Sequence, residues 1–518
     1  MGQGRYGSFQ YGAPRKYGTV ATSNLLWGLE IDWNNDGVFS EANEASQLVG
    51  FEIVRGRTSL FAADVGGEAN FARTQIGTLT LTCDNSDRRF DSLYASSPLY
   101  PNVQPARDVR FRVRNGNTGT TYDLFRGRIE DIDAQGYRDD PRASIRVSDG
   151  WRWLSERKAS IALRSSVVSD VMIGDVLDAV SYPSAWGRSL GAGADTLAYS
   201  FVENRDAFNV LHEVAESEFG LIFVGADGKF NFISRNTLIA QSISMTLDQS
   251  QVGNEPRVSK PWAVVKNIIR VQAHPRTLAA LAEIWRLRDT PSVAAGASLT
   301  IWAEFQDVNL SPAPATGVVS PVATTDFTMN TASDGSGSDL TASWTVTATI
   351  FSGSAKLVIT NNSASTGYIT LLKVRGQAIA ELNTTAYIVE DTDSQTDYGV
   401  HELVLNLPFQ QSTTFAKNLG DFLSPIFADP AFEIEVEIEN RPTIQFAYDL
   451  GTYIGFTSAY LGISHSYRIG KIVHLSRNSM QDIVTRWTLL PADESNQSFW
   501  LLGTAGRSEL GTTTKLGI

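Results

Sequence analysis

Residues 109–116 read VRFRVRNG, and apolar and basic side chains alternate strictly along this stretch. Side chains of a β-strand point to opposite faces in turn, so this period of two predicts a strand with one buried and one exposed face. Residues 77–83, GTLTLTC, repeat the pattern, and clusters of Gly, Asn and Asp between such runs supply turns. The segment 25–160 is therefore predicted to be a barrel or sandwich of short antiparallel strands, and a β-barrel domain is the favoured form.

Helical periodicity begins in the segment 161–260. Runs around residues 167–181 and 204–220 place apolar residues three and four positions apart, as one face of a helix requires. The second run is followed by a strand pair with Asp227-Gly228 at its turn, which is typical of a hairpin. This segment is predicted to be an α+β domain. A further helix is predicted from Ser412, ending before Pro425, because proline disfavours helix at the preceding residue.

Residues 290–380 have few charges and are rich in Ser, Thr, Ala and Gly, and alternating runs recur among them. This pattern predicts a small β-sandwich inserted into the chain. Trp302 and Trp344 are expected in its core, and stacking on sugars is the alternative.

The predicted fold class is thus mainly β with some α, in several domains. The remaining predicted parts flank the domains already described: an N-terminal arm at 1–24, a second β-barrel region beginning in 261–289 and 381–410, an α+β segment with barrel-closing strands at 411–495, and a C-terminal arm at 496–518.

The formal net charge of −13 argues against tight sequence-independent nucleic-acid binding, which needs Lys and Arg against phosphates. Residues 101–160 have 12 Lys and Arg against 9 Asp and Glu, whereas residues 381–518 have 8 against 17. Such asymmetry fits either head-to-tail matching between subunits or two separately solvated surfaces. The single cysteine, Cys83, precludes an intrachain disulfide and favours assembly in a reducing cytoplasm. The sequence contains no apolar run long enough to predict a membrane span.

The two arms share an unusual spacing of anchors. Tyr6, Tyr11 and Tyr17 each precede a glycine, as do Leu510 and Leu516. Glycine makes such segments supple and the large side chain gives each repeat one anchor, so the arms are expected to contact partners. The alternative is that both are frayed chain ends.

Residues 32–44 contain the one metal-like motif. Asp32, Asn34 and Asp36, followed by a glycine, match the first half of a calcium-binding loop. Asn43 stands where that loop requires a bidentate carboxylate, and Glu44 is one position later. Calcium is therefore one hypothesis, and a metal-free Asp- and Asn-rich turn is the other. No other cofactor is expected.

Four glutamates alternate with apolar residues near residue 435. They are Glu433, Glu435, Glu437 and Glu439. Their spacing places them on one face of a single strand. Three interpretations follow: a solvated strand face, a channel-lining acidic face in a ring assembly, or one carboxylate of a glycosidase pair.

The order of the segments resembles the tail-hub (baseplate hub or minor tail) proteins of tailed bacteriophages. The segments that bear the resemblance are 124–154, 200–236, 268–275 and 467–492, together with the early loop IDWNNDGVFSEANE at 31–44. In that family the first segment closes a first barrel, the second is a helix followed by a hairpin, and the last two open and close a second barrel. The insert and both arms lie outside the resemblance.

The resemblance implies a homotrimer in which each subunit contributes two tube-like β-barrel domains to a ring at the virion tail tip. Such a ring joins a distal tail or tail tube protein to tip or fibre proteins and lets DNA pass without specific binding. It needs no catalytic residues, and the chain is predicted not to be an enzyme. The alternatives are a receptor- or glycan-binding tip protein acting through 290–380, and a cell-wall hydrolase.

Overall fold

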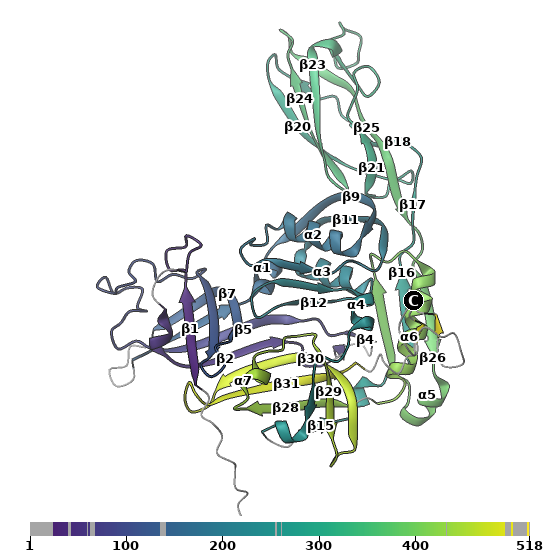
Figure 1. Ribbon diagram of the computed structural model, residues 1–518. Coiled ribbons are helices and arrows are strands. Elements are labelled where there is room, and N and C mark those ends of the chain that lie inside the picture. Colours follow the sequence, from purple (N-terminus) through teal and green to yellow (C-terminus); the bar gives the residue numbers. More distant parts are fainter. Residues whose placement is uncertain are drawn as a thin grey trace, which may run out of the picture.

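The computed structural model in Figure 1 is a β-rich body from which one elongated lobe projects. The structure describes residues 24–39, 43–59, 61–62, 68–134, 141–253, 256–260, 262–430, 432–492, 499–500 and 515–516.

One twelve-stranded sheet forms the base of the body and uses both ends of the chain. Its N-terminal strands are β1 (Leu25–Ile31), β2 (Leu48–Gly56), β5 (Gln75–Asp84), β6 (Asp108–Asn115), β7 (Thr121–Ala134) and β8 (Arg142–Ser148). Its later strands are β14 (Thr246–Asp248), β15 (Arg257–Ser259), β28 (Glu433–Glu439), β29 (Tyr453–Ser458), β30 (Ile463–Ser476) and β31 (Ile483–Pro491). The main path runs β1-β6-β7-β8-β5-β2-β30-β31-β28-β15, with β29 and β14 branching from β30.

The strand predictions for this sheet are confirmed. Val109, Phe111 and Val113 on β6 are fully buried, and Cys83 on β5 is a buried free thiol. Among the described ladders none joins β1 to β15, so in the described part of the chain the strands form an open path.

The α+β part lies against this sheet. It contains α1 (Gly150–Ser155), β9 (Lys158–Val168), α2 (Ser169–Ala179), β10 (Arg188–Leu190), β11 (Thr196–Asp206), α3 (Ala207–Glu216), β12 (Leu221–Val224), β13 (Phe230–Ile233) and α4 (Arg235–Ala240). The predicted helices correspond to α2 and α3. The predicted hairpin is the antiparallel pair β12–β13, where Gly228 adopts a φ of +85° that its turn requires. Asp206 caps α3 by accepting a hydrogen bond from the Asn209 amide.

A second, five-stranded sheet has the order β26-β16-β27-β4-β3. Its strands are β3 (Phe61–Ala62), β4 (Glu68–Phe71), β16 (Ile268–Ala273), β26 (Thr385–Glu390) and β27 (Glu402–Leu407), and α5 (Thr392–Tyr398) and α6 (Thr413–Phe427) accompany it. A short helix, α7 (Pro442–Gln445), follows β28. Near the end of the chain the backbone of β32 (Phe499–Trp500) pairs in parallel with that of β33 (Lys515–Leu516).

The predicted end of the helix before Pro425 is wrong, because α6 continues to Phe427 with Pro425 inside it. The extra turn buries Phe427, whose ring lies 5.0 Å from that of Phe61. Burial of a phenylalanine side chain contributes about 1.5–3 kcal/mol, which offsets much of the roughly 3 kcal/mol that a proline costs in a helix.

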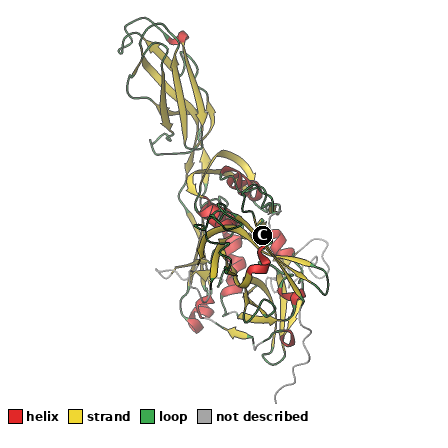
Figure 2. Cartoon of the chain, turned by 90° about the vertical axis from the view of Figure 1, so that its left-hand side faces the viewer, coloured by secondary structure: helices red, strands yellow, loops and turns green. Residues whose placement is uncertain are grey.

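The projecting lobe in Figure 2 spans residues 276–381 and so includes the whole segment 290–380 that is predicted as an insert. Its strands are β17 (Arg276–Leu278), β18 (Ala282–Arg286), β19 (Ser292–Val293), β20 (Ser298–Glu304), β21 (Ala315–Val319), β22 (Phe327–Asn330), β23 (Trp344–Ile350), β24 (Ser354–Asn361) and β25 (Gly367–Glu381). β25 pairs with five of the other strands, and β20-β24-β23 form a second sheet that shares one apolar core with the first. At the root of the lobe, the hydroxyls of Ser352 and Ser354 donate hydrogen bonds to Val202 and Glu203 of β11.

The two tryptophans of the insert differ in position. Trp344 is buried, as predicted, with 4% of its surface exposed. The core prediction for Trp302 is wrong, since 56% of its surface is exposed. Trp302 occupies an outward position of β20, opposite Lys356 of β24, and its ring stacks on Phe351 at 5.6 Å between centroids.

Candidate functional surfaces

The seam between the two halves of the long sheet is the pairing of β2 with β30. Residues 52–56 pair antiparallel with residues 471–475. Beyond the last pair, the Arg57 amide donates a 2.8 Å hydrogen bond to the Gly470 carbonyl. Gly56 has a φ of +100°, and a Cβ placed on it would lie 2.1 Å from that same carbonyl oxygen. Only glycine permits this close approach of the two strands.

Arg55 ties three parts of the chain together beneath the seam. Its side chain is buried and pairs with Asp449 at 2.7 Å from Nη2 to Oδ1. The other carboxylate oxygen of Asp449 accepts a 2.8 Å hydrogen bond from the amide of Ala226, at the β12–β13 hairpin. Asp149, the buried cap of α1, accepts a hydrogen bond from the Trp151 amide, and burial raises the pKa of Asp149 to about 7 although Arg55 lowers it. Arg55 thus joins β2 to Asp449 by an ion pair, and Asp449 in turn joins the β12–β13 hairpin by a hydrogen bond.

His474 lies on the buried side of the same seam. Its Nδ1 is 2.8 Å from the Thr485 hydroxyl, and burial, together with Arg55, lowers the pKa of His474 to about 3. The imidazole is therefore neutral in the folded protein at ordinary pH.

We expect this histidine to make stability fall with acidification. In the unfolded chain this histidine is protonated below about pH 6.5, whereas in the folded protein it stays neutral down to about pH 3. The contribution of His474 to the free energy of unfolding is therefore lost as the pH drops below 6.5. Between pH 7.5 and 5.0 wild type should lose about 2 kcal/mol from this residue, and a His474→Gln variant should not. Urea unfolding at both pH values measures the difference, with His465→Gln, an exposed histidine of β30, as control. Equal losses in wild type and His474→Gln would contradict it.

The four glutamates lie on β28 on the face opposite to its buried residues Ile434, Val436 and Ile438. Glu437 accepts hydrogen bonds from Arg477 at 2.9 Å and Arg486 at 2.8 Å, and Glu439 also pairs with Arg477. Glu435 stands opposite Arg257 of β15. Arginines thus accompany this acidic face. It does not continue across the seam as an acidic row, because the register joins Glu439 to exposed Glu52 through the apolar Val484 and Leu475.

The calcium-like loop is stabilised by its own amides. Asp32 is buried, and its two carboxylate oxygens accept hydrogen bonds from the amides of Asp36 and Gly37 at 3.1 and 2.8 Å. Glu44 is also buried and pairs with Arg89 at 3.2 Å.

The other two positions of the loop also have protein partners. Asn34 accepts a hydrogen bond from the side-chain amide of Asn102, and Asn43 accepts from the amides of Leu29 and Ala45. Within the described ranges, no group of three or more His, Cys, Asp or Glu side chains is placed to hold a metal ion, so Asp32, Asp36 and Glu44 are not gathered into one. The calcium site remains a prediction from the sequence.

The predicted arm contacts fall mostly beyond the structure. Tyr6, Tyr11, Tyr17 and Leu510 lie outside the described residues, and Leu516 is described only as backbone paired with Trp500. None of the described helices is long and apolar enough to cross a membrane.

The junction at Arg55 was not predicted from the sequence. An arginine within the strand FEIVRG at 51–56 follows the same alternation as the apolar Phe51 and Ile53, which was the available signal that it faces inward. Its partner Asp449 is nearly four hundred positions away in a turn, and nothing local to it indicates that contact.

No protein-family model matches the chain, and no curated protein matches it either. Several solved structures match over most of its length. The 43 kDa tail protein of prophage MuSo2 from Shewanella oneidensis is 9% identical, with 90% of this chain and 97% of that chain covered and a TM-score of 0.46. A tail protein from Neisseria meningitidis is 7% identical, with 90% and 96% covered and a TM-score of 0.46.

The prophage tail protein gp18 from Listeria monocytogenes is 7% identical, with 89% and 94% covered and a TM-score of 0.40. At TM-scores below 0.5 these likenesses by themselves carry no argument about function, which has to come from the residues of this chain. These three solved structures are tail proteins.

Proposed function

We propose that this protein is a structural hub at the tail tip of a tailed bacteriophage or phage-like particle. In this proposal three copies form a ring of tube-like β-domains that joins the tail tube to the tip and lets DNA pass. The resemblance of the segments 124–154, 200–236, 268–275 and 467–492 to tail-hub proteins supports it.

The observation that carries the proposal is the single sheet shared by the first and last thirds of the chain. Its buried face packs on two apolar cores, whereas the other face of its central strands presents polar and charged side chains such as Glu52, Arg146 and Glu435. A wall of a DNA-conducting ring needs such a face, polar and of mixed charge, because a strongly basic wall would retain the phosphates. The role requires binding surfaces and no catalytic group.

Two measurements test the hub. Mass photometry of the purified chain is expected to show a trimer, and immunogold labelling of intact particles with an antibody against residues 290–380 is expected to mark the tail tip. A chain that stays monomeric at all concentrations, together with label along the tail shaft or on the head, would sink the proposal.

A second candidate function is host attachment through the insert. The outward face of β20-β24-β23 carries three cross-strand rows, Trp302 with Lys356 and Thr349, Thr300 with Val358 and Thr347, and Ser298 with Thr360 and Thr345. An exposed aromatic ring braced by Phe351 and flanked by hydroxyl groups suits stacking and hydrogen bonding to a sugar.

Trp302→Ala is expected to lower adsorption of particles to host cells at least tenfold while particle yield stays normal. Stacking contacts of about 1.5 kcal/mol correspond to that factor, and several copies per particle add to it. Thr345→Ala, at the other end of the same face, is the matched control. Deleting the insert should abolish adsorption and leave assembly intact; failed assembly would make the insert architectural instead.

A further inference from the structure

A cavity of about 120 Å³ lies where the three parts of the body meet. The end of β4 and the residues after it, 71–74, form one side, α3 and the start of β12 form a second side, and α6 forms a third. Arg468 of β30 and the end of β31 complete its walls. Four phenylalanines line it, namely Phe71, Phe219, Phe422 and Phe427. A cleft or cavity with mostly apolar walls and a few polar groups is the usual form of a small-molecule binding site.

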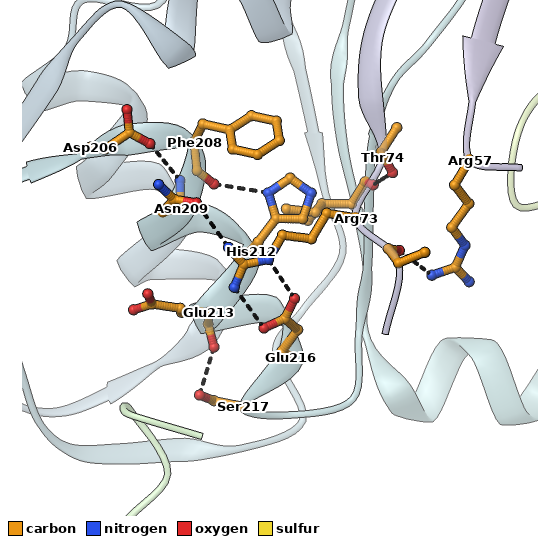
Figure 3. A network of polar contacts seen from close by, with 12 residues as sticks. Arg57, Arg73, Thr74, Asp206, Phe208, Asn209, His212, Glu213, Glu216 and Ser217 are labelled. Atoms are coloured by element: carbon orange, nitrogen blue, oxygen red, sulfur yellow. Dashed lines mark hydrogen bonds and ion pairs between the residues drawn. The ribbon is translucent and has the colours of Figure 1, made fainter. Parts of the chain in front are cut away.

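The charged side chains that line this cavity are those of Arg57, Arg73, Arg468 and Glu216. Arg73 forms a bidentate ion pair with the carboxylate of Glu216, in which Nε and Nη2 lie 2.9 and 3.1 Å from its two oxygens (Figure 3).

Arg57 instead donates a side-chain hydrogen bond to a neutral acceptor, the Ala72 carbonyl, at 3.0 Å. Burial and the neighbouring Arg468 lower the pKa of Arg57 to about 10, although Glu216 acts in the opposite direction, so burial disfavours the charged guanidinium. Cations in such surroundings are normally paired with anions.

His212 adds an unused acceptor to the same cavity wall. Only 4% of its surface is exposed, and its Nδ1 lies 2.8 Å from the Phe208 carbonyl, which can only accept a hydrogen bond. Nδ1 therefore carries the proton and Nε2 is a bare acceptor, consistent with the burial that lowers the pKa of His212 to about 3. Among the described residues Nε2 has no hydrogen-bond partner. Figure 3 shows the ring beside the Arg73 side chain.

We propose that this cavity binds a small carboxylate with an apolar, aromatic-sized body, the carboxylate meeting Arg57 and the body packing among the phenylalanines. Guanidinium groups bind planar carboxylates in a bidentate manner, which favours this head group over a neutral one. A cavity of about 150 Å³ is known to hold a benzene ring, and the space here, about 120 Å³ and not fully enclosed, is of the same order. Because the walls come from all three parts of the body, the ligand would stabilise their packing by mass action.

Benzoate is the probe, added to the full-length chain. We expect saturable binding by calorimetry and a rise in melting temperature of about 2 °C or more at saturation. Arg57→Gln should weaken binding at least tenfold, and Arg152→Gln, which alters a half-exposed surface arginine, should not change it. Ala215→Leu fills part of the cavity from α3 without altering any charge and should also abolish binding.

Three outcomes would overturn the proposal. One is absence of saturable benzoate binding by the folded wild-type chain. Another is equal affinity for benzyl alcohol, since the charge would then play no part. The third is equal affinity for inorganic phosphate, which would make this an anion site with no use for its apolar walls. Should Arg57→Gln fail to fold, Ala215→Leu decides by itself, because unchanged binding in that variant would place benzoate elsewhere.

Discussion

Gly56→Ala is expected to destabilise the protein by more than about 3 kcal/mol and to open the seam of the long sheet. The added Cβ would lie 2.1 Å from the Gly470 carbonyl oxygen and 2.9 Å from the Lys471 Cα. Both are backbone atoms, so relief requires β30 to move away from β2. The φ of +100° adds strain for any residue with a Cβ. Loss of this pairing would separate the two halves that the proposed ring wall needs together.

Urea unfolding gives the free-energy change, and hydrogen exchange of the amides at 52–56 shows whether the seam opens. Gly28→Ala is the matched control in the same sheet, since its Cβ would meet no atom nearer than 3.9 Å. That change should stay within about 1 kcal/mol of wild type. Equal stability of the two variants would mean that β2 and β30 lie far enough apart at Gly56 to accommodate a Cβ.

Local sequence patterns predicted strands and helices well where a single periodicity governs the segment. The strands at 77–83 and 109–116 follow from alternation, and α3 follows from its apolar stripe and its Asp206 cap. The end of α6 differs from the prediction because a tertiary contact, the burial of Phe427, offsets much of the local effect of Pro425.

Long-range pairing could not be predicted in the same way. The segments 268–275 and 467–492 were expected to open and close one barrel, yet β16 lies in the five-stranded sheet whereas β30 and β31 extend the long one. Alternation fixes which face of a strand is buried but says nothing about which strand lies beside it. In the proposed function, assembly of the ring closes these sheets into tubes.

In the candidate sites, too, local features could be predicted from the sequence, whereas contacts between distant segments could not. Asp32 and Asp36 were correctly seen as a tight loop of oxygen-bearing side chains, but sequence spacing cannot tell a metal ligand from an acceptor of backbone amides. The glutamates of β28 do share one face, whereas their arginine partners lie on other segments, Arg477 and Arg486. Alternation places Trp302 on the face of β20 that carries Ser298, Thr300 and Glu304, and the expectation of a core position followed the general preference of tryptophan for burial instead.

Arg55→Met is expected to destabilise the protein by about 3–5 kcal/mol at pH 8, because it leaves two carboxylates without their buried cation. Asp449 would lose its 2.7 Å ion pair, and the buried Asp149 would lose the positive charge that lowers its pKa. Methionine keeps most of the side-chain volume, so a cavity contributes little to the change. Arg152→Met, which breaks two half-exposed ion pairs, is the control and should cost about 1 kcal/mol or less.

The pH dependence of that loss distinguishes the junction from ordinary packing. The pKa of Asp149 is raised to about 7 in the folded protein, so the stability that this residue contributes is present at low pH and is lost as the pH rises through 7. Removing Arg55 raises that pKa further, which matters only where wild-type Asp149 is ionised. Urea unfolding should therefore show a larger difference between Arg55→Met and wild type at pH 8 than at pH 5. A difference that is the same at both pH values would mean that Arg55 acts through Asp449 and its neighbours alone, and that the cap of α1 is electrically independent of the seam.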